Sequence, residues 1–205
     1  MGKTIAIVNQ KGGVGKTTSC VNLAAALTAL GARVLVCDFD PQGNATSGFG
    51  LDKGRSPSVY DVILGDAPMS KAVIHTKWGD VVPANKALSG ATVELIALER
   101  REFRLKDAIE EVKGSYDVIF IDCPPSLELL TLDGLCAADT LLVPVQCEYY
   151  ALEGLSDLLY TVRLAKQRLN PSLELEGVVL TMYDGRTNLS LQVAEEVKRH
   201  FPGKV

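Results

Sequence analysis

Two lysines and two threonines stand in a glycine-rich run near the start of the chain, between a predicted strand at 3–9 and a predicted helix at 17–30. Glycines let backbone N–H groups surround phosphate oxygens, and the first turn of the following helix adds a favourable dipole. The run therefore predicts a site for the phosphates of a nucleotide. Its predicted binding residues are Lys11, Gly12, Gly13, Val14, Gly15, Lys16, Thr17 and Thr18.

Within this run, Lys16 is predicted to contact the β- and γ-phosphates, and the hydroxyl of Thr17 to ligate Mg²⁺. The run departs from the general phosphate-loop pattern G-x-x-x-x-G-K-[ST], because Gln10 stands in place of the first glycine. It also carries an additional lysine, Lys11, five residues before Lys16.

Aspartates end two further apolar runs. Asp122 closes the run 118–121, and at the carboxyl edge of a parallel sheet it would face the same crevice as the glycine-rich loop. Asp122 is therefore predicted to lie next to the bound metal ion. Asp38 and Asp40 end the strand predicted at 33–38 in the same way. We expect one of these two to position an attacking water, and the glycine-rich segment behind Asp40 to move with the nucleotide state.

Strand-length apolar runs alternate with longer segments of helical period, which predicts an α/β fold: a mostly parallel, twisted sheet with helices on both faces, of the P-loop class. The segment 40–55 is interpreted as a loop. We expect a single domain over 1–205, lacking its last strand and helices because Val205 stands where another strand would begin. Further strands are predicted at 80–83, 116–122, 139–145 and 175–182, and further helices at 59–64, 98–113, 151–169 and 189–201.

The composition excludes several classes of protein. The chain has 205 residues, 47% of them hydrophobic, and a net charge of −4, which excludes a disordered chain and a wholly basic nucleic-acid-binding domain. No apolar run approaches the roughly 18 residues of a membrane span, and no secretory leader is expected. The odd number of cysteines, five, in apolar contexts indicates reduced core thiols in the cytosol. They form no CxxC pair and the chain has only two histidines, which argues against a zinc site.

The two-lysine loop KGGVGKTT resembles the deviant Walker A motif of the ParA/MinD class of dimerising ATPases. Three other segments narrow the resemblance to ParA/Soj-type partitioning ATPases. The run from Asp38 to Thr46 is similar to their switch I, and Asp122-Cys123-Pro124-Pro125-Ser126 to their Walker B and switch II. The runs 143–154 and 180–184 are also similar to Soj-type proteins.

The resemblance implies roles for individual residues. Lys11 would be the signature lysine, which reaches the partner's phosphates across an ATP-sandwich dimer. Asp40 would orient the attacking water, and Asp122 would support the metal through water. Arg186 occupies a position associated with sequence-independent DNA binding. Met182 either lines the pocket for the base or ends a strand.

The resemblance also implies a cycle: a homodimer forms with ATP and Mg²⁺, binds double-stranded DNA non-specifically, and is released on hydrolysis stimulated by a ParB/Spo0J-type centromere-binding protein. The expected location is the cytoplasm, on the nucleoid, with no membrane contact. Two alternatives stay open: a MinD-like membrane-associated switch and an iron–sulfur reductase of the nitrogenase iron-protein kind.

Charge patterning gives no independent support for DNA binding. Arg100, Arg101, Arg104 and Lys106 alternate with acidic residues, which favours a solvated helix face over a DNA patch. Residues 151–205 carry seven Lys/Arg and seven Asp/Glu, so they have no basic excess.

Overall fold

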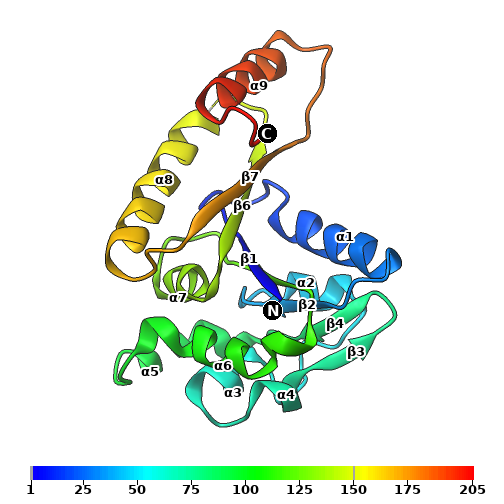
Figure 1. The fold of residues 1–205 in the computed structure, drawn as a ribbon, viewed down its shortest axis with the longest axis vertical. Coiled ribbons are helices and arrows are strands. Elements are labelled where there is room, and N and C mark those ends of the chain that lie inside the picture. The colour runs from blue at the N-terminus through cyan, green and yellow to red at the C-terminus, as the bar shows by residue number, and fades with distance from the viewer. Residues whose placement is uncertain (1, 150) are drawn as a thin grey trace.

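A computed structural model describes residues 2–149 and 151–205. Its centre is a seven-stranded sheet in the order β3-β4-β2-β5-β1-β6-β7, in which every neighbouring pair is parallel except β3 with β4 (Figure 1). The central strands are apolar except for polar residues at their ends, because helices cover both faces of the sheet. The strands are β1 (Lys3–Ile7), β2 (Val34–Asp38), β3 (Ile74–Thr76), β4 (Gly79–Val82), β5 (Val118–Asp122), β6 (Thr140–Gln146) and β7 (Glu174–Thr181).

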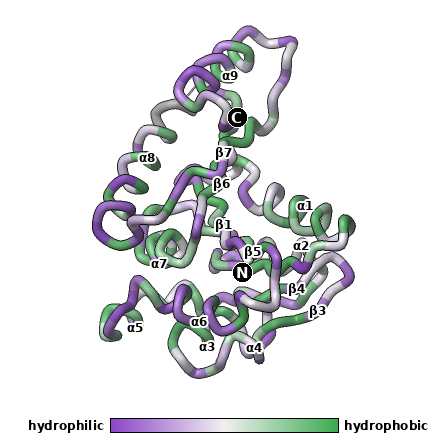
Figure 2. The backbone as a smooth tube through the Cα atoms, in the orientation of Figure 1, coloured by the Kyte–Doolittle hydropathy of each residue, from purple (hydrophilic) through white to green (hydrophobic). Residues whose placement is uncertain are grey.

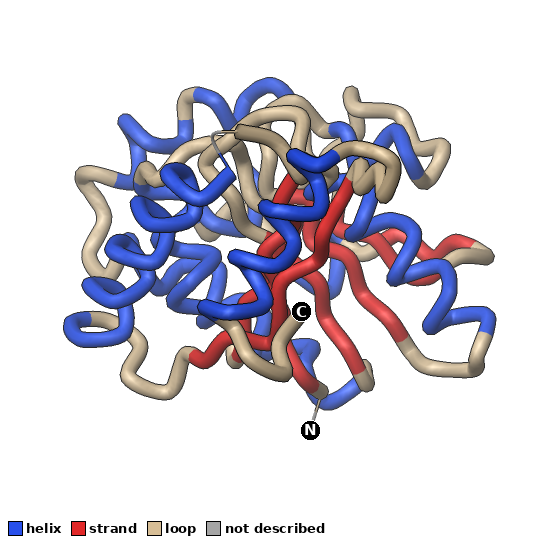
Figure 3. The backbone as a smooth tube through the Cα atoms, turned by 90° about the horizontal axis from the view of Figure 1, so that it is seen from above, coloured by secondary structure: helices blue, strands red, loops and turns tan. Residues whose placement is uncertain are grey.

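Helices lie on both sides of the strands, as Figure 3 shows from above. On one face α1 and α2 pack against β1, β2 and β5 around Ile7, Val36 and Phe120. The other helices pack on the opposite face, where their apolar side chains form a larger cluster. At the end of the sheet formed by β6 and β7, α9 lies beside α8. The helices are α1 (Lys16–Ala29), α2 (Asn44–Gly48), α3 (Val59–Leu64), α4 (Met69–Ala72), α5 (Ala91–Leu95), α6 (Arg104–Val112), α7 (Leu129–Ala137), α8 (Ala151–Arg168) and α9 (Asn188–His200).

Hydropathy follows this layering. The hydrophobic colouring gathers along the central strands, whereas α8 and α9 carry hydrophilic stretches (Figure 2). All five cysteines are buried thiols, as the composition predicts.

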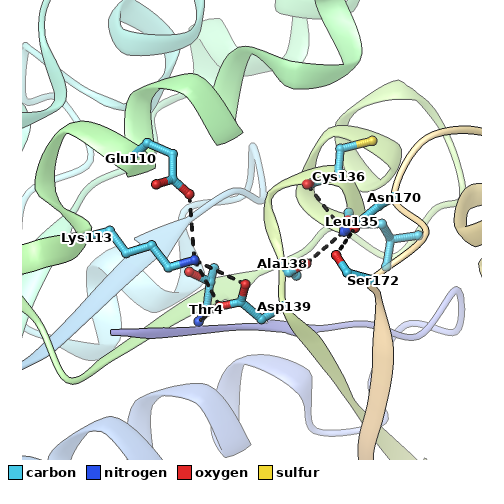
Figure 4. A network of polar contacts seen from close by, with 9 residues as sticks. All are labelled: Thr4, Glu110, Lys113, Leu135, Cys136, Ala138, Asp139, Asn170 and Ser172. Carbon is cyan, nitrogen blue, oxygen red and sulfur yellow. Dashed lines mark hydrogen bonds and ion pairs between the residues drawn. The ribbon is translucent and has the colours of Figure 1, made fainter. Parts of the chain in front are cut away.

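Polar contacts tie the layers together where the strands begin (Figure 4). The buried ammonium of Lys113 lies 3.0 Å from the carboxylate of Asp139, which also accepts a 2.8 Å hydrogen bond from the backbone N–H of Thr4. The side-chain amide of Asn170 donates to the carbonyls of Leu135 (2.9 Å) and Ala138 (2.8 Å) at the end of α7. These contacts anchor the amino ends of the strands, at the edge of the sheet opposite to the glycine-rich loop.

The predicted fold class is confirmed, and most predicted elements begin and end within two residues of the observed ones. Two expectations were wrong. The segment 40–55 contains the short helix α2, and the helix expected at 98–113 is regular only over Arg104–Val112, with 3₁₀ turns on either side. Arg100 stops a longer helix, because its φ of 54° is left-handed. Among the described helices, none is both long and apolar enough to cross a bilayer.

Candidate nucleotide-binding site

The glycine-rich loop connects β1 to α1 at the carboxyl edge of the sheet. Gly13 and Gly15 have φ angles of 76° and 91°, which only glycine adopts without strain. A Cβ added at Gly12 or Gly13 would meet no atom within 4 Å, so open space lies next to the loop backbone. The first N–H groups of α1 have no intrahelical partner, and Gly15 caps the helix without a side chain. A phosphate group fits this cradle.

The loop forms one wall of a cleft of about 280 Å³. The predicted residues Gly12, Gly13, Gly15, Lys16, Thr17, Thr18, Asp40 and Met182 line this cleft, together with Gln42, Asn44 and Pro125. Val14 does not line it: the side chain is buried, and its carbonyl accepts a 2.8 Å hydrogen bond from the hydroxyl of Thr181.

The two lysines of the loop point to different places. The ammonium of Lys16 is buried and donates to the carbonyl of Lys11 across the loop, at 3.0 Å. Burial lowers the pKa of Lys16, and the negative charge of Asp122 partly offsets this effect. The side chain of Lys11 instead forms an ion pair with Glu148, in the segment between β6 and α8. The side chain of Lys16 therefore lies at the cleft, whereas that of Lys11 points away from it.

Asp38, Asp40 and Asp122 lie at the same edge of the sheet, because β2 and β5 end at the same level. Asp38 and Asp122 are register partners on these adjacent strands, and both are fully buried. Burial and the charge of Asp38 raise the pKa of Asp122 to about 7, while burial raises that of Asp38 to about 6. Asp38 is committed to α2, since its carboxylate accepts from the N–H and the hydroxyl of Thr46 at 2.7 and 2.6 Å. Of the two water-positioning candidates, only Asp40 lines the cleft.

The site also fits a divalent cation. Neither carboxylate oxygen of Asp122 makes a well-formed hydrogen bond in the part of the chain that the structure describes, although both are buried; the hydroxyl of Thr17 is close enough to lower the pKa of this carboxyl. A buried, unpartnered carboxylate is costly unless a positive charge satisfies it. The hydroxyl of Thr17 lies at the cleft, and Mg²⁺ prefers oxygen ligands of these two kinds.

The remaining predicted site residue, Arg186, lies outside the cleft. It is in the segment between β7 and α9, and its guanidinium forms two hydrogen bonds of 2.8 and 2.7 Å with the carboxylate of Asp184. The arginine side chain is 90% exposed. Met182 begins the same segment with a left-handed φ of 51°.

Sequence reasoning missed several residues at the site. Glu148 lies in the run similar to Soj-type proteins, but no local signal pairs it with Lys11. Gln42 and Asn44 belong to the glycine-rich segment behind Asp40. This segment was expected to respond to the nucleotide, but no role was predicted for these two side chains. Thr181 braces Gly15 from another strand, and only the folded chain brings the two together.

Comparison with known proteins decides the family. The family model described as an AAA domain matches residues 2–175. The chain is 57% identical to the sporulation initiation inhibitor protein Soj of Bacillus subtilis (strain 168), over all of this chain and 82% of that protein. It is 51% identical to the chromosome partitioning protein ParA of Myxococcus xanthus (strain DK1622), over all of this chain and 74% of that protein. The chain belongs to the ParA/Soj family of partitioning ATPases.

A solved structure extends this comparison to the site. The chain superposes on the crystal structure of cobyrinic acid a,c-diamide synthase from Mycobacterium smegmatis with bound ADP and magnesium, with a TM-score of 0.93 and 44% identity. The match covers 98% of this chain and 83% of that one. A related protein of the same fold, 44% identical to this chain, thus binds ADP and magnesium. The predicted P-loop class, ATP-hydrolase activity and family resemblance are confirmed.

Proposed function

We propose that this protein is a Mg²⁺-dependent ATPase switch for DNA segregation. ATP drives two subunits into a sandwich dimer, the dimer binds DNA without sequence specificity, and hydrolysis releases it. The observation that carries the proposal is that the side chains of the two loop lysines point to different places. Lys16 serves its own cleft, while Lys11 points out of it toward Glu148 and reaches a second subunit once that ion pair opens.

The residues of the cleft have distinct tasks in this proposal. The loop N–H groups and Lys16 hold the phosphates, and Thr17 and Asp122 hold Mg²⁺, Asp122 through water. The bound Mg²⁺ supplies positive charge against the charge that develops on the phosphates. Asp40 orients the attacking water, and Met182 contacts the base. Lys11 of the partner subunit stabilises the transition state in trans, so that hydrolysis depends on assembly.

DNA binding belongs to the dimer. We assign Arg186 to the phosphates of the duplex, and two copies per dimer raise the affinity above that of one subunit. Each phosphate contact contributes about −0.9 to the slope of log K against log salt, so binding falls steeply with ionic strength. A ParB/Spo0J-type partner stimulates hydrolysis, and the switch acts on the nucleoid in the cytoplasm.

The test uses the Asp40→Ala variant, which is expected to bind ATP and dimerise without hydrolysing it. Anisotropy of a labelled random-sequence duplex is measured with ATP–Mg²⁺ and with ADP–Mg²⁺. We expect salt-sensitive binding with ATP only, and loss of that binding when Arg186→Ala is added. Equal binding with both nucleotides, or none with either, contradicts the switch. Unchanged turnover in Asp40→Ala contradicts the role of Asp40 alone.

The iron–sulfur alternative has no support from the cysteines. Cys123 and Cys136 are about 1% exposed, so neither offers its thiolate to a cluster shared between subunits.

A further inference from the structure

The segment that carries Asp40 is held in place from two sides. On one side the contacts are buried: Thr46 donates to Asp38, and the hydroxyl of Thr46 accepts from the N–H of Ala84 at 3.0 Å. These groups are buried and connect α2 to the ends of β2 and β4. The same Asp38 carboxylate accepts from the N–H of Asp40 at 3.3 Å, so the buried contacts hold the first residue of the turn 40–43. They do not hold Gln42 or Gly43 in that turn.

Lys53 supplies the contact on the other side. Its ammonium lies 2.5 Å from the carbonyl oxygen of Gln42 and 3.5 Å from the side-chain oxygen of Asn44. The stem of the same lysine covers Gly43, where an added Cβ would come within 3.1 Å of the lysine Cδ. Gln42 and Asn44 both line the cleft, whereas Lys53 does not.

The contact reaches Asp40 through one residue. The N–H of Gln42 donates to the carboxylate of Asp40 at 2.9 Å, and the N–H of Gly43 donates to the carbonyl of Asp40 at 2.8 Å. Lys53 therefore fixes the carbonyl of the same residue whose N–H orients the Asp40 carboxylate. A hydrogen bond from a charged donor is stronger than a neutral one, and the lysine stem adds packing.

Among the side chains that the structure describes, no carboxylate forms an ion pair with the ammonium of Lys53. The neighbouring Asp52 instead accepts from the N–H of Gly54 at 2.9 Å. The charge of Lys53 is thus directed wholly to the turn beside the cleft.

We propose that Lys53 is a positioning residue for ATP hydrolysis, which acts by holding the turn 40–43 so that the Asp40 carboxylate faces the cleft. The proposal rests on the proposed role of Asp40. Lys53 touches neither the nucleotide nor the water; it sets the orientation of the residue that does. Loss of its donor leaves α2 in place but lets the turn move, which lowers kcat without weakening nucleotide binding.

The test compares Lys53→Met, which keeps the apolar stem, with Lys53→Arg, which keeps a charged donor. For each variant we measure kcat, the Kd of a non-hydrolysable ATP analogue with Mg²⁺, and Tm. We expect Lys53→Met to lower kcat about tenfold, with Kd and Tm unchanged, because small misplacements of catalytic groups cost one to two orders of magnitude in rate. Lys53→Arg should recover most of the rate. Lys71→Met, in α4, is the matched control and should behave as the wild type.

Asp40→Ala and the double variant Asp40→Ala/Lys53→Met separate this proposal from the proposed function. If Lys53 acts through Asp40, the double variant is no slower than Asp40→Ala. An unchanged or higher kcat in Lys53→Met, while Asp40→Ala is inactive, overturns the role of Lys53. A higher Kd together with a lower Tm in Lys53→Met, without rescue by arginine, would assign it a merely structural role. An active Asp40→Ala instead refutes the role of Asp40, on which the role of Lys53 rests, while the switch itself is tested by the ATP dependence of DNA binding.

Discussion

Asp38 and Asp122 stand side by side at the ends of neighbouring parallel strands, fully buried, yet only the carboxylate of Asp38 makes well-formed hydrogen bonds among the described residues. The surroundings of the two acids therefore differ although their positions are equivalent. Asp38 holds the segment that carries Asp40, while Asp122 is the acid whose charge the Mg²⁺ of the proposed function would balance.

Removal of the Asp122 charge is expected to uncouple nucleotide binding from magnesium. In the wild type, Mg²⁺ added to an ATP analogue should raise stability, by about 2.7 kcal/mol when the complex is at 100 times its Kd. In Asp122→Asn this increment should largely disappear, while the increment from the analogue alone stays. Thermal unfolding with and without Mg²⁺ measures both. Asp133→Asn, another buried acid, serves as the control, and an equal magnesium increment in Asp122→Asn would refute the assignment.

Glu148→Gln is expected to favour the ATP dimer. Lys11 must leave Glu148 before it can reach a second subunit, and this ion pair is broken twice per dimer. Since partly exposed pairs contribute little each, we expect the dimer Kd to fall roughly two- to tenfold. Sedimentation in the Asp40→Ala background with ATP–Mg²⁺ provides the measurement, with Glu111→Gln as the control. A weaker dimer would mean that Glu148 acts within the assembled state rather than against it.

Asp184→Asn is expected to strengthen DNA binding. Asp184 competes with a DNA phosphate for the guanidinium of Arg186, and the aspartate pKa is lowered by that same hydrogen-bonded partner. Without this competition, the affinity for a random duplex in the ATP state should rise about threefold, with a larger salt dependence. Anisotropy titrations at two salt concentrations test this, against Asp66→Asn. An unchanged affinity would show that Arg186 does not contact DNA.

Asp133 should make the protein less stable as the pH rises. Burial raises its pKa to about 8, and one of its oxygens has no partner among the described residues. The folded state therefore binds more protons than the unfolded state between pH of about 4 and 8, so the free energy of unfolding falls with pH in that window. Asp133→Asn should make this decline shallower by about 1.4 kcal/mol per pH unit.

Urea unfolding at pH 5.5, 6.5 and 7.5 measures the slope for Asp133→Asn and for the wild type. Asn keeps an oxygen for the 3.1 Å hydrogen bond from the N–H of Leu105, so packing of α6 on α7 should survive. Equal slopes in the two proteins would show that Asp133 titrates normally in the fold.

The sequence alone determined the order of the main elements and the place of the nucleotide site. Glycine spacing, apolar runs and helical period are local signals, and strands that end in Asp38 and Asp122 must meet at one edge of a parallel sheet. Local signals failed for α2, because four of its five residues, all except Ala45, are poor helix formers. That helix exists because Asp38, on the adjacent strand, accepts two hydrogen bonds from Thr46.

Only the tertiary structure decided which partner each charged side chain takes. Lys11 and Lys16 are two lysines of the same loop, but their side chains have different partners. Lys11 forms an ion pair with Glu148, whereas Lys16 donates to the carbonyl of Lys11. Lys53 faces the carbonyl of Gln42 because Gly43 leaves room for its stem. Such pairings depend on where loops from distant segments come to rest, and that position is set by the packing of the whole sheet rather than by any local pattern.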